Sequence, residues 1–292
     1  MTRHDLFVGI TSWNSALFLP HCLAALQRTT AQLRTRVCVL DNGSEDASAS
    51  LASAQGAEVV VRRCTQPQAL QQLVRMSREP FTLLLHADVI LLADDWFQRC
   101  SARLNGTTVL ISPEDIGCGP LTRPFGRGMP ESSFLLFETA GLRRARTLVW
   151  KRRHRLPYPR REFDFSGGHV THNIPRRLAE RGLSWQPMRV YPSNAEPDPL
   201  FIPEPGVSLW SEELGHLRYG LGNFYGIDGR ITHYHNWYDR MITARTSVGT
   251  GGGRQFPAAF INAYSQRFLA DLQAGRVDLP RDLGSDREPV AL

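Results

Sequence analysis

The segment RVCVLDNGSED, residues 36–46, decides the fold of this chain. Residues 36–40 predict a buried strand, and the polar residues after them predict a turn and a helix over 45–54, with Ser44 as its N-cap. The same alternation continues on both sides. Further strands are expected over 6–11, 57–61 and 81–85, and further helices over 20–33 and 67–77. Because continuously apolar strands that alternate with helices form parallel sheets covered on both faces, the fold class is α/β.

This regularity ends after residue 112. Residues 113–130 contain eight Gly or Pro residues and predict a long loop. Beyond it we expect a strand over 133–137, a helix over 173–181 ended by Gly182, a helix over 257–274 and a frayed tail over 278–292. The five prolines of 192–205 exclude a helix there. No internal repeat and no sharp change of composition marks a second domain.

The composition is that of a globular protein and excludes wholesale disorder, since 42% of the 292 residues are hydrophobic and 21% are charged. The longest apolar run, 81–93, is interrupted by His86 and Asp88, so no transmembrane helix is expected, and the first residues do not resemble a signal peptide. Five cysteines without a CxxC pair argue against a disulfide framework and against a zinc knuckle. They favour buried thiols in a reducing cytosol.

The net charge of +6 is unevenly distributed. Residues 143–161 contain nine arginines and lysines and no acidic residue. Such a run suits phosphates, acidic lipid headgroups or acidic polymers, and a solvated basic face is an equally good interpretation.

Polar residues follow three of the predicted strands, at the edge where open parallel sheets bind ligands. The three segments are Thr11-Ser12-Trp13-Asn14, Asp41-Asn42-Gly43-Ser44-Glu45-Asp46 and His86-Ala87-Asp88. They predict a binding site at this edge. A GxGxxG segment after the first strand and a GxxxxGK[ST] segment are both missing, which disfavours a dinucleotide fold and a P-loop.

These segments resemble the family 2 glycosyltransferases of GT-A fold. The matching pieces are VGITSWN (8–14), LPHCLAAL (19–26), VLDNGSEDAS (39–48) and LLLHAD (83–88), of which DNGS-x-D is the most specific. The resemblance implies a GT-A domain over 1–245, with an open, mostly parallel Rossmann-like sheet flanked by helices. Its nucleotide-sugar-binding half would be 1–112 and its acceptor half, with irregular loops, 113–245. A C-terminal extension, 246–292, would hold a Gly-rich loop, a helix and the frayed tail.

The resemblance also implies a donor site. In the family, the end of the first strand and the Asp after the second strand hold the base and ribose, which here are Thr11, Asn14 and Asp41. A carboxylate can accept the imide N–H of uracil or guanine. The alternative for Asp41 is a turn before a helix. Arg254, after the glycines of 249–253, is a candidate phosphate clamp, and a plain linker is the alternative for that segment.

The family's metal motif is DxD after the fourth strand, and here it is His86-Ala87-Asp88. The resemblance implies that Asp88 binds Mn²⁺ or Mg²⁺, which bridges the donor phosphates. His86 is a candidate for ribose or metal contact, and a buried structural histidine is the alternative. A late histidine often adds a contact in the family. His233 and His235 both qualify, with His233 slightly preferred, and an aromatic core segment is the alternative.

The catalytic base is where the sequence departs from the family. Counting back from the helix that contains Arg177 and Gly182 places Gly168-His169 where the family has a Glu-Asp pair. Asp164 and His169 are the candidates of nearly equal rank, followed by His172, because an inverting transfer needs a carboxylate or imidazole to take the acceptor proton. A turn before Gly167 is the alternative for Asp164.

The sequence therefore predicts an inverting, metal-dependent glycosyltransferase that moves a hexosyl or deoxyhexosyl group from a nucleoside-diphosphate sugar. The acceptor would be a glycan, a lipid-linked or glycolipid acceptor, or a small-molecule hydroxyl, bound by aromatic rings. The candidate rings are Tyr158, Trp185, Tyr191 and Phe201. The family's usual setting implies bacterial polysaccharide or glycolipid assembly in the cytoplasm, with peripheral contact to an anionic membrane and no nucleic-acid partner. Two alternatives are a catalytically inactive GT-A-like protein that binds a nucleotide or glycan, and a sugar nucleotidyltransferase, which would need a Gly-rich basic loop after the first strand.

Overall fold

The computed structural model describes residues 5–114, 117–118, 121–122, 129–145, 170–171, 174–192, 219, 222–236, 247–249 and 255–280. Its first part alternates strands and helices as predicted. These elements are β1 (Leu6–Ser12), α1 (Leu19–Thr29), β2 (Thr35–Asp41), α2 (Ser48–Ala54), β3 (Glu58–Val61), α3 (Gln66–Met76) and β4 (Phe81–His86). In this part β1 is central, and it pairs in parallel with β2 on one side and β4 on the other.

The second part is less regular. Its elements are β5 (Val89–Leu91), α4 (Trp96–Ser101), β6 (Thr108–Pro113), β7 (Gly117–Cys118), β8 (Leu121–Thr122), β9 (Phe134–Glu138), α5 (Thr139–Ala145), α6 (Ile174–Ala179), β10 (Ser184–Pro192), β11 (Asn223–Ile227), β12 (Arg230–His235), β13 (Ser247–Gly249), β14 (Gln255–Pro257) and α8 (Ala258–Gln273). The expected long loop over 113–130 thus includes the short β7–β8 hairpin.

Ten strands form one sheet in the order β3-β2-β1-β4-β9-β6-β10-β11-β12-β5. Its core strands β3, β2, β1 and β4 are parallel, as predicted, and β6 and β10 also pair in parallel. β9 enters antiparallel between β4 and β6, and the pairs from β10 to β5 are antiparallel. As a result, the start of β9 and the end of β12 reach the same edge of the sheet as the carboxyl end of β4.

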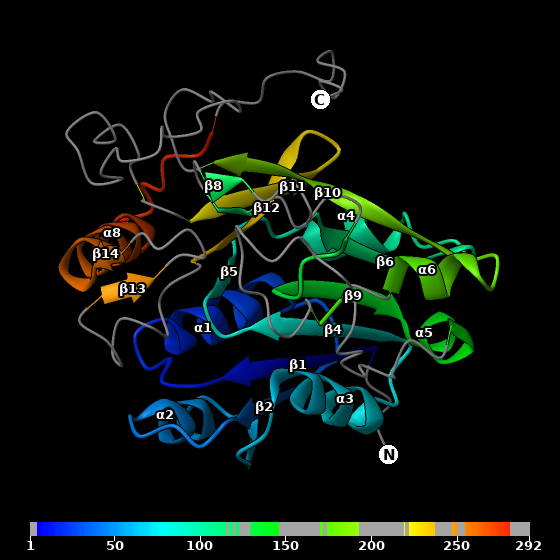
Figure 1. Cartoon of the computed structure of the whole chain (residues 1–292), viewed down its shortest axis with the longest axis horizontal. Coiled ribbons are helices and arrows are strands. Elements are labelled where there is room, and N and C mark those ends of the chain that lie inside the picture. Colours follow the sequence, from blue (N-terminus) through cyan, green and yellow to red (C-terminus); the bar gives the residue numbers. More distant parts are fainter. Residues whose placement is uncertain are drawn as a thin grey trace.

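The sheet is buried on both faces because alternate side chains of each strand point to opposite sides. Leu6, Val8 and Ile10 of β1 pack into one apolar cluster with α1, α4 and α8. Phe7 packs into a second cluster with α3, α5 and α6. Figure 1 shows α1 and α3 on opposite sides of β1. The predicted C-terminal helix is confirmed and joins the first cluster, where Phe268 stacks on Tyr234 with 3.8 Å between ring centroids.

The helix predicted over 45–54 begins later, at Ser48, with Ala47 as its N-cap. Ser44 does not cap it, because both its backbone N–H and its hydroxyl donate to the Asp41 carboxylate. The side chain that was expected to start the helix instead closes the turn after β2.

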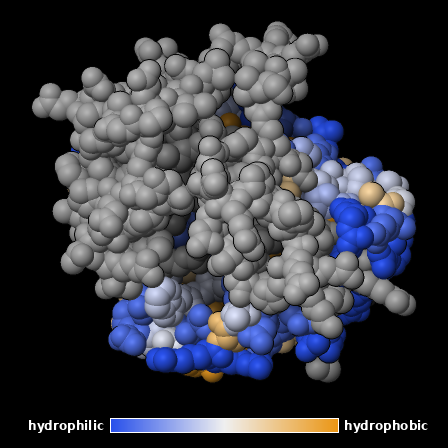
Figure 2. All heavy atoms as spheres, in the orientation of Figure 1, coloured by the Kyte–Doolittle hydropathy of each residue, from blue (hydrophilic) through white to orange (hydrophobic). Residues whose placement is uncertain are grey.

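The surface of the described part is mainly polar. Figure 2 shows a largely hydrophilic lower edge with small apolar areas. The large apolar side chains that are exposed in the described ranges are Trp13, Val61 and Leu279. No helix among the described residues is both long and apolar enough to cross a membrane.

Candidate active site

Hydrogen bonds join the loops after β1 and β2 to each other. The Asn14 backbone N–H donates to Ser44 Oγ at 2.8 Å, and the Glu45 backbone N–H donates to Asn14 Oδ1 at 2.9 Å. Asn14 adopts φ +47°, a left-handed conformation that asparagine tolerates better than most residues. Asp46 accepts from the backbone N–H of Ala16 at 3.0 Å. The DNGS-x-D segment therefore holds the β1 loop in place.

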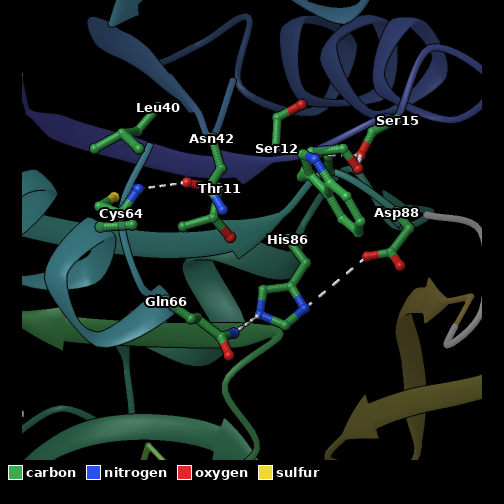
Figure 3. Close-up of a pocket in the computed structure, with 12 residues that line it drawn as sticks. Thr11, Ser12, Ser15, Leu40, Asn42, Cys64, Gln66, His86 and Asp88 are labelled. Atoms are coloured by element: carbon green, nitrogen blue, oxygen red, sulfur yellow. Dashed lines mark hydrogen bonds and ion pairs between the residues drawn. The ribbon is translucent and has the colours of Figure 1, made fainter. Parts of the chain in front are cut away.

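A cleft of about 450 Å³, part of it open to solvent, lies where these loops meet β4 and α3 (Figure 3). The lining residues are Thr11, Ser12, Trp13, Ser15, Leu40, Asn42, Cys64, Gln66, Ala69, His86, Ala87 and Asp88. The strand ends singled out in the sequence thus form one cavity.

The three residues that were predicted to contact the base and ribose do not all line the cleft. Thr11 lines the cleft, whereas Asn14, in the loop after β1, and Asp41, at the end of β2, are buried beside it. Asp41 Oδ1 accepts from Ser44 N at 2.7 Å and Oδ2 from Ser44 Oγ at 2.6 Å. Asn42, which the sequence argument did not assign, lines the cleft instead and accepts from the Cys64 backbone N–H at 2.6 Å. The roles of Asn14 and Asp41 toward a donor stay predictions.

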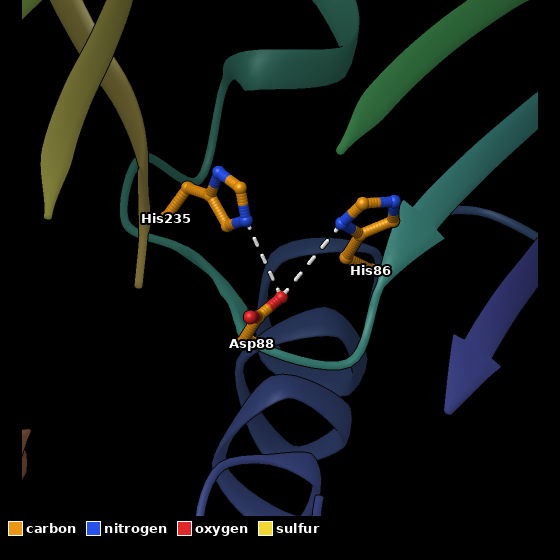
Figure 4. A group of neighbouring side chains, drawn as sticks. All are labelled: His86, Asp88 and His235. Carbon is orange, nitrogen blue, oxygen red and sulfur yellow. Dashed lines mark ion pairs between the residues drawn. The ribbon is translucent and has the colours of Figure 1, made fainter. Parts of the chain in front are cut away.

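At one end of the cleft, His86, Asp88 and His235 converge (Figure 4). His86 ends β4 and Asp88 lies in the turn to β5. β12 supplies His235, because its pairing with β5 places His235 opposite Val89, next to Asp88. Asp88 Oδ1 lies 3.4 Å from His235 Nε2 and 4.0 Å from His86 Nδ1. All three side chains are buried, and their candidate ligand atoms lie within 4.8 Å of one another.

This cluster fits a divalent cation. Two imidazole nitrogens and one carboxylate oxygen form a mixed donor set, and imidazole shifts the preference from Mg²⁺ toward Mn²⁺. The cluster also borders the cleft, since His86 and Asp88 line it. A cation held there would therefore be accessible to a ligand in the cleft.

Two further side chains contact the histidines from outside the cluster. Gln66 Nε2 lies 2.8 Å from His86 Nε2. Glu131 Oε1 lies 2.8 Å from His235 Nδ1, and Glu131 Oε2 accepts from the Tyr225 hydroxyl at 2.6 Å. Neither residue was predicted from the sequence. Gln66 starts the helix that follows the third strand, and that position was an available signal. Glu131 precedes the strand predicted over 133–137, and the sequence does not show that this end of the strand lies at the site.

Opposite charges dominate the electrostatics around His235. Burial lowers the pKa of its imidazole, but the carboxylates of Asp88 and Glu131 outweigh burial and raise this pKa to about 9. Burial likewise raises the pKa of Glu131, but the charge of His235 and hydrogen bonds, including that from Tyr225, outweigh it and lower this pKa to about 2. Without a cation, an imidazolium therefore lies between two carboxylates.

His233, the slightly preferred late histidine, is not brought to the cluster. It pairs with Leu91, two residues further from Asp88 than Val89. Its ring lies between Phe134 and Tyr225, at centroid distances of 4.5 and 4.9 Å. Burial lowers its pKa to about 3. His233 therefore occupies an aromatic core position, which was the alternative to a metal contact. His235 is the late histidine that lies at the cluster.

Other candidates from the sequence lie outside the described residues or in the core. Asp164, His169 and Arg254 lie outside the described residues, as do Tyr158, Phe201 and most of the basic run. Of the rings expected to stack on sugars, Tyr191 is only 4% exposed and packs in the core, so that expectation was wrong for it. Trp185 is partly buried against the second apolar cluster.

The fold and the cleft at the strand ends define a GT-A type α/β protein. The sequence profile of glycosyl transferase family 2 matches residues 7–163, more than half of the chain. The chain therefore belongs to glycosyl transferase family 2. No curated protein matches the chain.

The chain is also similar to several solved structures, but its sequence identity to them is low. The mannosyltransferase PcManGT from Pyrobaculum calidifontis, in complex with GDP-Man and Mn²⁺, has a TM-score of 0.44 and 15% identity, with 74% of this chain and 63% of that one covered. Glucosyl-3-phosphoglycerate synthase from Mycobacterium tuberculosis, in complex with Mn²⁺, UDP and glucosyl-3-phosphoglycerate, has a TM-score of 0.38 and 16% identity, with 48% and 58% covered. Mannosyl-3-phosphoglycerate synthase from Rubrobacter xylanophilus has a TM-score of 0.39 and 17% identity, with 49% and 55% covered. The chain spans less than two thirds of each.

Proposed function

We propose that this protein transfers a hexosyl or deoxyhexosyl group from a nucleoside-diphosphate sugar, with inversion, and uses Mn²⁺ or Mg²⁺. The observation that carries this proposal is the convergence of His86, Asp88 and His235 at one end of a cleft formed by the ends of β1, β2 and β4. A nucleotide along the cleft would place its diphosphate toward this cluster. The metal complexes of PcManGT and of the glucosyl synthase agree with this cofactor.

The chain's own residues have separate tasks in this proposal. His86, Asp88 and His235 would hold the cation, which when bound neutralises charge on the leaving diphosphate. Trp13 lines the cleft and is 39% exposed, so its indole offers a face on which a base or sugar ring can stack. Thr11 and Asn42 add a hydroxyl and an amide to the wall of the cleft. Arg254 is proposed as a phosphate contact.

We also propose a role for each region of the chain. Residues 1–112 would bind the donor, residues 113–245 a glycan, lipid-linked or small-molecule acceptor, and 246–292 would form a C-terminal extension. The basic run over 143–161 would face a phosphate-containing acceptor or an anionic membrane. We infer a role in bacterial polysaccharide or glycolipid assembly, in the cytoplasm or at the inner face of the membrane.

A donor screen tests the proposal. Purified protein would be incubated with UDP-, GDP- and dTDP-sugars, with Mn²⁺ or with a chelator, and release of the nucleoside diphosphate would be measured. We expect release from one donor class that depends on the metal. Nucleotide binding by calorimetry without turnover of any donor would favour the inactive binding protein. An inert, non-binding protein would contradict both functions.

The base is tested separately once a donor is known. Either Asp164→Asn or His169→Gln should lower turnover by about 10²–10⁴-fold with little change in donor affinity. A histidine base should place the acidic limb of the pH profile around 6.5, and a carboxylate base should place it lower. Full turnover in both variants would exclude both residues and point to His172.

The anomeric configuration of the product, read by NMR, decides whether transfer inverts.

A further inference from the structure

Glu131 is a buried carboxylate behind the cluster rather than in it. It is 4% exposed, and its two oxygens have different partners. Oε1 faces His235 Nδ1 at 2.8 Å and Oε2 accepts from the Tyr225 hydroxyl at 2.6 Å. Burying a carboxylate is costly unless it is paired and hydrogen-bonded. Glu131 meets that condition, because it is paired with His235 and accepts a hydrogen bond from Tyr225. His235 is itself a candidate metal ligand.

The geometry divides the two ring nitrogens of His235 between two carboxylates. Nδ1 faces Glu131, whereas Nε2 faces Asp88 at 3.4 Å. An ionised carboxylate only accepts hydrogen bonds, so it keeps the proton on Nδ1. With the proton there, the lone pair of neutral His235 lies on Nε2, which is the nitrogen aimed at Asp88 and the cluster. A carboxylate in this position orients a metal-binding imidazole and raises its basicity.

Gln66, the partner of His86, does not fix a tautomer in the way that Glu131 does. Gln66 Nε2 lies 2.8 Å from His86 Nε2, and an amide N–H donates, so the contact as placed makes Nε2 the acceptor. The two ends of a primary amide can exchange places, however, and its oxygen would then accept from a protonated Nε2. Gln66 therefore holds the ring of His86 and allows either tautomer. Glu131 holds the ring of His235 and selects one.

Glu131 also changes the charge of the cluster. The segment His86-Ala87-Asp88 gives it one carboxylate, and His86 contributes no negative charge. Glu131 adds a second negative charge on the far side of His235. The electrostatic attraction for a divalent cation therefore includes a carboxylate that does not touch it.

We propose that Glu131 is a positioning residue of the metal site, which fixes His235 so that the lone pair on Nε2 is directed at a divalent cation, and which supplies a charge that His86 lacks. This inference rests on the proposed function only in taking the cluster as a metal site. Tyr225 completes the arrangement, because its hydroxyl holds the second oxygen of Glu131. The chain of contacts runs from Tyr225 through Glu131 and His235 to the cation.

Mn²⁺ binding without nucleotide, measured by electron paramagnetic resonance of the free ion and by calorimetry, tests this proposal. Glu131→Gln should weaken Mn²⁺ binding by about 10- to 100-fold, the usual effect of losing such a partner. Glu131→Asp keeps the charge and should recover part of the loss. Tyr225→Phe should weaken binding less than Glu131→Gln, because the carboxylate remains.

A matched control separates this effect from a loss of stability. Glu79 is also a buried carboxylate, 6% exposed, and pairs with Arg36 at 3.3 Å far from the cluster. Glu79→Gln should lower the unfolding temperature and leave Mn²⁺ affinity unchanged. A second readout is the tautomer of His235, seen in long-range ¹H–¹⁵N spectra of the metal-free protein at a pH where the His235 ring is neutral. The parent should show the proton on Nδ1, and Glu131→Gln should lose that preference.

Each outcome bears on the proposal. Parental Mn²⁺ affinity and tautomer in a folded Glu131→Gln variant would overturn the role of Glu131 and leave the proposed function standing. A parent chain that binds no Mn²⁺ would overturn both the role and the metal site. Weakened Mn²⁺ binding in Glu131→Gln, in a protein that transfers no sugar, would uphold the role and reject only the transferase activity.

Discussion

The loops after β1 and β2 and the turn after β4 lie at the same edge of the sheet, yet their carboxylates have different partners. Asp41 and Asp46 accept hydrogen bonds from backbone N–H groups and hydroxyls of their own and the neighbouring loop. Asp88 faces two imidazoles instead. The first pair shapes the wall of the cleft, and Asp88 is the carboxylate that we propose as a cation ligand. A carboxylate at a strand end is thus not by itself a ligand, and its partners decide its role.

The largest expected effect comes from Asp88. Asp88→Asn keeps the shape of the side chain and removes the one carboxylate of the cluster, and contacts that involve a full charge are the stronger ones. We expect Mn²⁺-stimulated turnover to be abolished, measured as release of nucleoside diphosphate over a range of Mn²⁺ concentrations. Parental activity with parental metal dependence would show that Asp88 is not a ligand. Asp94→Asn, a change at an exposed acid on the surface, is the control and should leave the activity unchanged.

The second prediction uses pH to sharpen the contrast. His235 holds a proton below a pKa of about 9, and a cation can bind only after that proton leaves. Mn²⁺ affinity should therefore rise with pH, by about tenfold per unit between pH 6 and 8 for one displaced proton, and level off above pH 9. Calorimetry in buffers of different ionisation heat measures the proton release. His235→Gln should bind weakly and show a much smaller slope, and a parent affinity independent of pH would contradict this assignment.

A smaller effect is expected in the loop after β2. Asp41→Ala leaves Ser44 without its two acceptors, which should lower the free energy of unfolding by about 1–3 kcal/mol. Nucleotide affinity should also fall, since the neighbouring Asn42 lines the cleft. Urea denaturation and calorimetry with UDP, GDP and dTDP measure the two effects. Asp41→Asn, which retains an acceptor oxygen, should lose less of both. Unchanged affinity in Asp41→Ala for the nucleotide that binds the parent would remove Asp41 from the donor site.

The same comparison explains how much the sequence could reveal. Thr11, His86 and Asp88 were found because they follow continuously apolar parallel strands, whose carboxyl ends must share an edge. Glu131 was missed because it precedes its strand. It reaches the site only since β9 runs antiparallel to β4, and the sequence does not state that direction. In the same way, choosing between His233 and His235 required the register of β12 on β5.

The smallest expected effect concerns His233, the neighbour of His235 on the same face of β12. Its Nε2 is buried without a hydrogen-bond partner among the described residues, and its Nδ1 lies 3.0 Å from the Thr232 hydroxyl. That hydroxyl also donates to the Tyr225 carbonyl, so it keeps a partner when the imidazole is removed. His233→Phe should therefore change the free energy of unfolding by less than about 1.5 kcal/mol, as for other substitutions that nearly conserve volume.

Mn²⁺ affinity decides what His233 does. It should match that of the parent in His233→Phe and fall in His235→Gln, although the two histidines are two residues apart. Should Phe prove too large for the space between Phe134 and Tyr225, the smaller His233→Leu provides the same comparison without overpacking. A loss of Mn²⁺ affinity in both folded His233 variants, as large as in His235→Gln, would mean that the cation is held from both positions. The register of β12 would then not be what selects the ligand.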